Sequence, residues 1–288
     1  MNIVVLGASG QVGSVILQGL KSGHNVVGTS RHGTSTLLAF DPFADDWASL
    51  GKPDVIINCI GQIEPKVSSG FERIHVELIS LLLANRATLG RPRIIQISAL
   101  GARKDHAVAF LRTKAVGDEL LLQVPNTVVL RPSIICTNRT MLVKKMLILS
   151  AIARYTGVIC LPRGVRETKL QPVMPDDLVD VIKVVLNPVE EKIINVVGPK
   201  EISLNELLKR LSVTRHQRPL LIDMPQTIMN MLMRYLVEPL NPRLLNLQQY
   251  QLLFENNVAD SQQIQKLLGR SANPVDDFFN QEFEYANH

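Results

Sequence analysis

Short apolar runs alternate with amphipathic stretches along the first half of the chain. Runs rich in Val and Ile are typical of buried strands, and apolar residues at spacings of three and four are typical of helices packed on a sheet. The helical pattern occupies 11–21, 71–87 and 108–123. This alternation predicts a doubly wound parallel α/β sheet. Its expected strands are 3–6, 25–29, 36–40, 54–60, 93–98 and 127–131.

The pattern loosens after residue 132, where prolines separate shorter segments. We expect 1–135 to form the sheet domain and 136–288 to form a smaller, mostly helical annex with some segments returning to the sheet domain. Ser203 and Glu206 form a capping box, which marks the start of a helix. The other expected elements are a helix capped by Asp176 and Asp177 that ends at 186, a strand over 193–197, and helices over 204–211, 227–236, 247–254, 262–268 and 275–279.

Composition and charge exclude several classes of protein. Hydrophobic residues make up 46%, charged residues 20% and aromatic residues 5%, which is typical of a globular α/β chain. The net charge of +5 is spread without a basic run, so we expect no nucleic-acid partner. Cys59, Cys136 and Cys160 show neither Cys-x-x-Cys spacing nor a neighbouring His cluster, which argues against disulfides and zinc and favours a reducing, cytoplasmic location.

A glycine-rich turn separates the first expected strand from the first helix. Gly7, Gly10 and Gly13 follow the apolar run at spacings of three. Glycine permits the tight turn, the close approach of backbone to a pyrophosphate and the close packing of helix on strand. The motif predicts a Rossmann-type dinucleotide site at the helix N-terminus, and a purely structural glycine turn is the alternative. Further expected contacts come from Ser9, Gln11 and Val12.

The end of the second strand distinguishes NAD from NADP. An acid at this position holds the ribose hydroxyls of NAD, but this chain has Ser30 and Arg31 there. Arg31 can pair with a 2′-phosphate and Ser30 can donate to it, so we expect NADP(H) as the cofactor; a solvated surface arginine is the alternative. The remaining expected nucleotide contacts are Asp41 after the third strand and Asn58, Ile60 and Gly61 after the fourth.

These motifs, together with 98–102, the helix of 110–119 and 131–133, resemble the extended and atypical short-chain dehydrogenase/reductases. More narrowly, 98–102, 110–119, 171–173 and 252–257 look like the NADPH-binding accessory subunits of respiratory complex I and their bacterial relatives. The resemblance covers most of the chain. It implies a Rossmann fold like that of NAD-dependent epimerases and dehydratases, and a respiratory-chain or ubiquinone context.

The resemblance also implies a set of catalytic positions. In the broad family a Tyr four residues before a Lys protonates the substrate carbonyl, the Lys lowers the pKa of the Tyr and holds the nicotinamide ribose, and a Ser orients the substrate. Ser98 and Lys114 match the Ser and the Lys, but Phe110 stands at the Tyr position. Because a phenyl ring has no proton to give, we expect NADP(H) binding with weak or no catalysis.

Two other functions stay open. One is an active NAD(P)-dependent oxidoreductase or epimerase that uses a displaced acid. The residues considered for that role are His106, Lys104, Asp105 and Tyr155, each of which is more readily explained as a structural or surface residue. The other is an NADP-sensing regulatory protein with a transient protein partner.

The stretch 141–161 is the most apolar part of the second half. Its cations Lys144, Lys145 and Arg154 are costly in a bilayer centre, so we expect no transmembrane helix. Two interpretations of 141–155 remain: a face that contacts a protein partner or lies on an anionic membrane, peripheral to the inner membrane, or a helix that covers the cofactor cleft. The first apolar run begins at Met1, and we expect no export signal before it.

Overall fold

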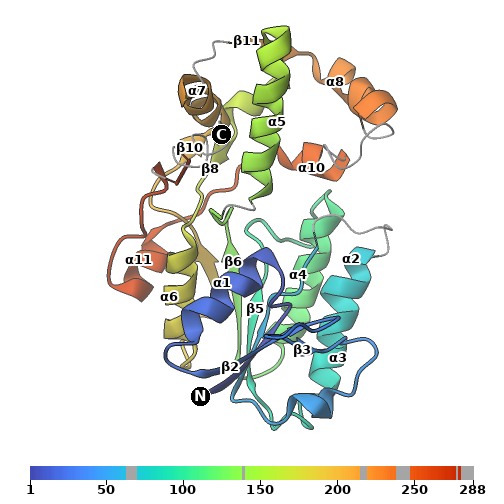
Figure 1. Cartoon of the computed structure of the whole chain (residues 1–288), viewed down its shortest axis with the longest axis vertical. Helices are drawn as coiled ribbons and strands as arrows, with labels where there is room; N and C mark the ends of the chain where they lie inside the picture. The colour runs from blue at the N-terminus through green and yellow to red at the C-terminus, as the bar shows by residue number, and fades with distance from the viewer. Residues whose placement is uncertain (63–69, 138–139, 215–218, 238–246, 277, 280–288) are drawn as a thin grey trace. The chain divides into compact units, whose positions relative to one another are not determined.

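The computed structural model describes residues 1–62, 70–137, 140–214, 219–237, 247–276 and 278–279, and the chain divides into two units (Figure 1). The first unit comprises Met1–Pro132, Pro175–Val197 and Asp260–Ala272. The second comprises Ser133–Met174, Gly198–Ala259 and Asn273–His288. Each unit therefore collects segments that lie far apart in the sequence.

A seven-stranded parallel sheet forms the core of the first unit, in the order β3-β2-β1-β4-β5-β6-β9. β1 lies between β2 and β4, so Val4 is opposite Val27 on one side and Ile56 on the other. This order confirms the doubly wound α/β fold expected from the sequence. The strands are β1 Asn2–Leu6, β2 Asn25–Ser30, β3 Leu38–Ala39, β4 Val55–Asn58, β5 Arg93–Ile97, β6 Thr127–Pro132 and β9 Ile193–Val196.

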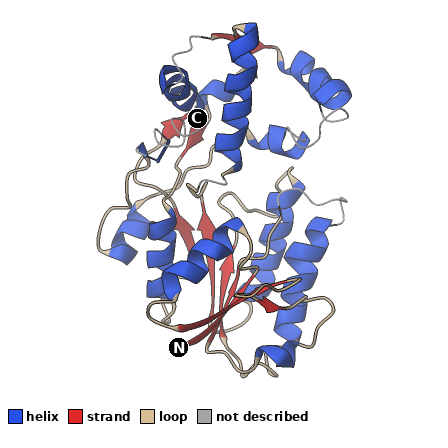
Figure 2. Cartoon of the chain, in the orientation of Figure 1, coloured by secondary structure: helices blue, strands red, loops and turns tan. Residues whose placement is uncertain are grey.

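Helices cover both faces of this sheet (Figure 2). Val4 and Leu6 are buried in one apolar cluster with Leu78 and Leu82, and because side chains alternate along a strand, Val5 points to the opposite face. On that pattern both faces of β1 are apolar, as a strand of a fully covered parallel sheet requires. The helices are α1 Gln11–Leu20, α2 Gly70–Glu72, α3 Leu78–Ala84, α4 Ala109–Leu122, α6 Pro175–Val185 and α11 Gln262–Leu268.

The helix expected over 71–87 contains a π-helical turn. This turn, η2 at Arg73–Glu77, joins α2 to α3. A Cβ on Gly117 would lie only 2.1 Å from the His75 carbonyl oxygen, so α4 approaches the turn more closely than any other residue type would allow. Gly117 therefore fixes the π turn against α4 and places His75 beside it.

Arg270 connects two returning segments of the first unit. It donates to Asp177 at 2.7 Å and to Asp180 at 2.7 Å. The expectation that Asp176 and Asp177 cap this helix is wrong, because α6 begins at Pro175 and both residues lie in its first turn. The buried Asp177 carboxylate binds Arg270 and so fastens the segment that follows α11 onto α6.

The second unit packs helices around two small sheets. Its apolar cluster includes Val165, Leu207, Leu208 and Phe279, all buried. Ser203 caps α7 as expected, since its hydroxyl accepts the Glu206 N–H at 3.1 Å. Within the part of the chain that is described, no helix is long and apolar enough to cross a membrane. The elements are α5 Met141–Thr156, β7 Val158–Pro162, β8 Lys169–Leu170, β10 Ile202–Ser203, α7 Leu204–Thr214, β11 Leu220–Met224, α8 Gln226–Leu232, the π-helical η4 Met233–Val237 and α10 Leu247–Leu252. The helix expected over 275–279 includes residue 277, which lies outside the described residues.

Candidate functional site

Glycines shape the loop between β1 and α1. Gly7 has a φ of 76°, a left-handed conformation that favours glycine, and its carbonyl accepts the Gly10 N–H at 3.0 Å. A Cβ on Gly13 would lie 2.3 Å from the Gly7 oxygen. Only glycine at position 13 therefore allows α1 to pack this closely on the loop, so the structure brings the three predicted glycines together.

The first turn of α1 has neither a capping side chain nor an acidic residue. Its N-cap is Gly10, which has no side chain to bond the amides of the first turn, and no acidic residue lies in that turn. Free amides at a helix N-terminus and the helix dipole favour a negative charge. Gln11 and Val12 begin the helix, and Ser9 is exposed just before it. This cradle fits the pyrophosphate of a dinucleotide.

The residues predicted for the adenosine end face each other. β2 ends at Ser30, and Arg31 Nε lies 3.7 Å from Asp41 Oδ2. The Arg31 side chain is 68% exposed, so its planar guanidinium remains accessible to a phosphate. Asp41 Oδ1 accepts the Phe43 N–H at 3.1 Å, which orients the carboxylate. The sequence predicted a cation without an acid after β2, whereas the structure places an acid from the end of β3 beside that cation.

Asn58 shapes the loop after β4. Its buried amide donates to Gln96 Oε1 at 2.8 Å, and its Oδ1 accepts the Ile60 N–H at 3.1 Å. Ile60 in turn lies against the glycine loop, since a Cβ on Gly7 would approach Ile60 Cγ1 to 2.9 Å. The two loops are therefore held together through Asn58 and Ile60.

Lys114 is buried next to this second loop. Its Nζ donates to the Ile97 carbonyl at 3.0 Å, and a Cβ on Gly61 would lie 3.3 Å from the same nitrogen. Burial lowers the pKa of Lys114 to about 8, although the nearby Asp118 carboxylate opposes the shift. Burial also raises the pKa of the Cys59 thiol to about 12. Lys114 thus holds its proton at neutral pH and loses it slightly above.

Ser98 belongs to a buried polar network. Its hydroxyl donates to Asp118 Oδ2 at 2.8 Å, and Arg131 donates to the same oxygen through Nε at 3.1 Å and Nη2 at 2.9 Å. Burial raises the pKa of Asp118, while these two partners oppose the shift. Asp118 was not among the site residues predicted from the sequence. Its position one turn after Lys114 on α4 could have indicated that it lies near the lysine.

Phe110 lies on the same face of α4 as Lys114. The Lys114 Nζ is 5.8 Å from the centre of the Phe110 ring, within the range of a cation–π contact. The ring also meets His75 edge to face, with centres 5.5 Å apart. His75 Nδ1 is 2.8 Å from Thr113 Oγ1, and burial lowers the pKa of His75 to about 3, so the imidazole is neutral. His75 was not predicted from the sequence, because only the π turn and Gly117 bring it to this place.

The residues considered as substitute acids are engaged in other contacts or lie at the surface. His106 is buried, and its Nδ1 accepts the Val108 N–H at 2.9 Å at the start of α4. Lys104 and Asp105 are exposed and form ion pairs with neighbouring side chains. Tyr155 belongs to the second unit and is 88% exposed. These contacts give His106 a structural role in the turn before α4.

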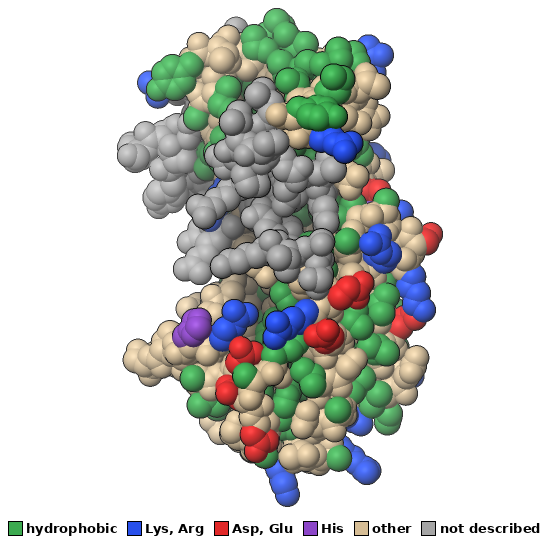
Figure 3. Space-filling view, turned by 90° about the vertical axis from the view of Figure 1, so that its right-hand side faces the viewer, with side chains coloured by type: hydrophobic (Ala, Val, Ile, Leu, Met, Phe, Trp, Pro, Cys, Tyr) green, Lys and Arg blue, Asp and Glu red, His purple; other side chains and the backbone are tan. Residues whose placement is uncertain are grey.

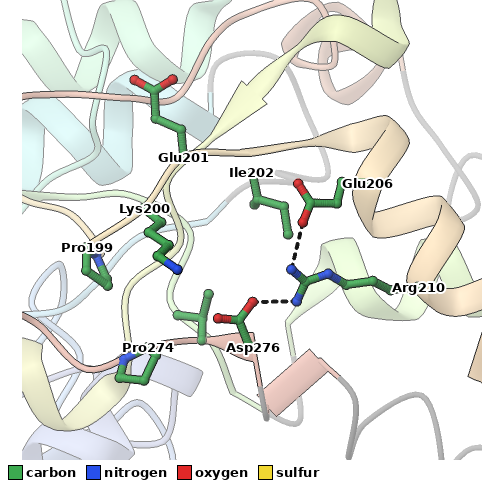
Figure 4. Close-up of a pocket in the computed structure, with 9 residues that line it drawn as sticks. Pro199, Lys200, Glu201, Ile202, Glu206, Arg210, Pro274 and Asp276 are labelled. Atoms are coloured by element: carbon green, nitrogen blue, oxygen red, sulfur yellow. Dashed lines mark hydrogen bonds and ion pairs between the residues drawn. The ribbon is translucent and has the colours of Figure 1, made fainter.

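A separate cavity of about 100 Å³ lies in the second unit (Figure 4). Arg210 bridges Glu206 and Asp276 across it, at 2.7 and 2.5 Å. These two ion pairs join α7 to the segment around residue 276. That structural role accounts for these charged side chains at this cavity. Within the described ranges, no group of three His, Cys, Asp or Glu side chains could hold a metal ion.

Comparisons with solved structures identify the fold. The chain is similar to UDP-glucuronic acid 4-epimerase from Bacillus cereus in complex with UDP-glucuronic acid and NAD, with a TM-score of 0.73, 17% identity, and coverage of 100% of this chain and 99% of that chain. It is also similar to UDP-glucose 4-epimerase from Thermotoga maritima with UDP-glucose, with a TM-score of 0.72, 14% identity and the same coverage.

A third solved structure binds the phosphorylated cofactor. RMD from Pseudomonas aeruginosa, complexed with NADPH, has a TM-score of 0.66, 14% identity, and coverage of 99% of this chain and 97% of that chain. No protein-family model matches the sequence, and no curated protein sequence matches it significantly. At these identities the comparisons establish the fold alone: the chain has the Rossmann-type α/β fold of these solved structures, which include UDP-sugar 4-epimerases and a protein complexed with NADPH.

Proposed function

We propose that this protein binds NADP(H) and has weak or no activity as a carbonyl reductase. The observation that carries the proposal is the pairing of a buried Lys114 with Phe110 on one face of α4. Lys114 supplies a cation that can hold a nicotinamide ribose. Phe110 lacks the hydroxyl that would protonate a substrate.

Three parts of the first unit would hold the nucleotide. The glycine loop and the first turn of α1 fit the pyrophosphate, because that turn has no capping side chain and no acidic residue. Arg31 would contact the 2′-phosphate of NADP(H), in competition with its ion pair to Asp41. Lys114 would donate to the nicotinamide ribose. When bound, the nicotinamide supplies or accepts a hydride, and this chain's residues determine whether a proton accompanies it.

The groups around Lys114 are poorly suited to deliver that proton. The Ser98 hydroxyl already donates to Asp118. His75 is neutral, because burial lowers its pKa to about 3, and Cys59 is a weak acid, because burial raises its pKa to about 12. A general acid works best when its pKa lies near the operating pH. Nucleotide binding would therefore serve stability or signalling more than turnover.

An active oxidoreductase or epimerase is the second candidate, and one observation favours it. The pKa of Lys114 is lowered to about 8, which is near the operating pH and suits a residue that exchanges protons. Several solved structures with this fold are of UDP-glucuronic acid 4-epimerase in complex with NAD. In this alternative Lys114 would replace the tyrosine, and activity would disappear in Lys114→Met.

The cellular context rests on the resemblance to complex I accessory subunits. It favours a cytoplasmic protein at the periphery of the inner membrane, in a respiratory-chain or ubiquinone setting, with a protein partner. Affinity capture of the intact chain with and without added NADPH tests this part. Recovery of respiratory-chain or quinone-biosynthesis proteins supports it, and a partnerless protein argues for an independent enzyme.

The nucleotide carried by the purified protein tests the proposal itself. We expect mass spectrometry of the released ligand to show NADP(H), and calorimetric titration to give a lower Kd for NADPH than for NADH. Equal affinity for both nucleotides would contradict the assignment of Arg31. The absence of any nucleotide binding would contradict the proposal as a whole.

A further inference from the structure

Apolar side chains form an exposed stripe along α5. Ile148, Ile152 and Tyr155 follow one another at spacings of four and three, so they share one face of the helix. All three are exposed, and Tyr155 reaches 88%. Lys144 is also exposed and lies one turn before Ile148 on the same face. A helix that only covers a core would turn polar residues outward here.

The neighbouring two-stranded sheet also exposes apolar side chains. β11 pairs with β7 in parallel, with Leu220 opposite Val158 and Ile222 opposite Cys160. Leu220 is 63% exposed and Ile222 is 40% exposed, while Ile159 on the other face is buried in the unit's core. This small sheet is therefore apolar on both faces, and one of them meets solvent.

A third stripe follows on α8, which packs beside β7, and on η4, which continues α8. Ile228, Met231 and Tyr235 are exposed by 47%, 62% and 70%. Figure 3 shows hydrophobic side chains gathered in the upper part of the view, with Lys and Arg side chains at the margin. We define the apolar face of the second unit as Ile148, Ile152, Tyr155, Leu220, Ile222, Ile228, Met231 and Tyr235.

The charges on the same elements are almost all positive. α5, β7, α8 and η4 contain Lys144, Lys145, Arg154 and Arg234 and no acidic residue. β11 contributes Asp223, whose carboxylate is paired with Arg166. Lys144, Arg154 and Arg234 thus border the apolar face, and α5, β7, α8 and η4 carry no carboxylate.

We propose that the apolar face of the second unit lies on an anionic lipid surface. Apolar and aromatic side chains would enter the headgroup boundary, and the bordering cations would meet lipid phosphates. A second copy of the chain fits less well, because a two-fold interface would bring Lys144, Arg154 and Arg234 of both copies together without carboxylates to pair them. This inference does not depend on nucleotide binding, since every residue in it belongs to the second unit.

Vesicle co-sedimentation of the full chain tests the proposal. We expect binding to vesicles of equimolar phosphatidylcholine and phosphatidylglycerol, and much weaker binding to phosphatidylcholine alone. Replacing Lys144, Arg154 and Arg234 by Gln should weaken binding by about fivefold per cation. The matched control replaces the exposed Lys21, Lys52 and Lys266 of the first unit by Gln and should leave binding close to wild type.

A second set of variants tests the apolar contribution. Tyr155→Ser, Met231→Ser and Tyr235→Ser combined should lower vesicle binding by about tenfold or more. Val27→Ser, Leu38→Ser and Val184→Ser, at exposed apolar positions of the first unit, are the control. Unchanged thermal midpoints verify folding, because all these side chains are exposed.

Three results would overturn the proposal. The first is no binding to either vesicle, and the second is binding that the Ser triple variant leaves unchanged. The third is a dimer in sedimentation equilibrium that the same Ser variant dissociates, without vesicle binding, which would assign the face to a second copy. Stronger binding at low salt than at high salt would support the contribution of the cations.

Discussion

The Lys114 ammonium lies 5.8 Å from the centre of the Phe110 ring, on the same face of α4. The contact replaces a possible hydrogen bond with a cation–π interaction, which stabilises the charge without offering a proton. Lys114 is also bonded to the Ile97 carbonyl, so its position does not depend on a hydroxyl at residue 110. Binding and proton transfer can therefore be separated experimentally in this protein.

Arg31 and Asp41 should have opposite effects on cofactor preference. Arg31→Ala should remove most of the preference for NADPH over NADH, because a charge-assisted contact is worth about 1.5–3 kcal/mol. Asp41→Asn should increase the preference, since it removes the carboxylate 3.7 Å from Arg31. Calorimetric titration of each variant with both nucleotides measures these changes. A rise in NADH affinity alone in Asp41→Asn would contradict this arrangement.

Gly13→Ala should damage the nucleotide site. Its Cβ would lie 2.3 Å from the Gly7 oxygen, so the loop or α1 must shift, at a cost of about 1–3 kcal/mol. We expect at least a tenfold weaker NADPH affinity by titration, from a loss of about 1.4 kcal/mol or more. Gly23→Ala is the control, because a Cβ there has no neighbour within 4 Å. Equal effects of the two substitutions would show that the glycine loop does not hold the nucleotide.

Lys114→Met should weaken nucleotide binding and stabilise the fold. Burial lowers the folded-state pKa from 10.5 to about 8, so the unfolded chain binds an extra proton between these values and wild-type stability rises with pH across that window. At neutral pH the free energy of unfolding of the variant should exceed that of wild type by about 1–2 kcal/mol. The variant avoids the cost of burying the ammonium, and this gain is larger than the loss of the hydrogen bond to Ile97. Denaturant unfolding at neutral pH and at pH about 10 measures the difference, which should shrink at the higher pH.

The protonation of Lys114 should also make the affinity for NADPH depend on pH. Because Lys114 carries its proton below about pH 8, wild-type affinity for NADPH should fall as pH rises through that value. Lys114→Met should bind more weakly and show no such fall. A wild-type affinity that stays constant across this range would argue against a contact between Lys114 and the nucleotide.

Local rules predicted much of the fold and of the glycine loop. The alternation of apolar runs and amphipathic stretches identified six strands of the sheet, and the signal was clearest for β1, β4, β5 and β6, because burial on both faces demands apolar residues. Gly7 and Gly13 were identifiable because their backbone conformation and close contacts exclude side chains. The strand over 193–197 was also expected, but its pairing with β6 is a long-range contact that no local pattern encodes.

The rest of the site depends on such long-range contacts. Asp41 meets Arg31 only because β3 pairs with β2 in parallel, so the sequence showed a cation without its partner. His75 reaches Phe110 through a π-helical turn, and helical periodicity alone does not reveal such a turn. The position of Asp118 beside Lys114 on α4 could be predicted from the sequence. Its bonds to Ser98 and Arg131 could not, because they join three separate parts of the fold.

The oxidation of NADPH by wild type and Phe110→Tyr tests the central claim most directly. Absorbance decay is followed with a broad panel of aldehydes, ketones and quinones, after titration has shown that both forms bind NADPH. We predict no wild-type turnover above the protein-free rate, and a gain in Phe110→Tyr toward the ~10²- to 10⁴-fold that a positioned acid contributes. Rapid NADPH oxidation by the wild-type protein with any member of the panel would contradict the account.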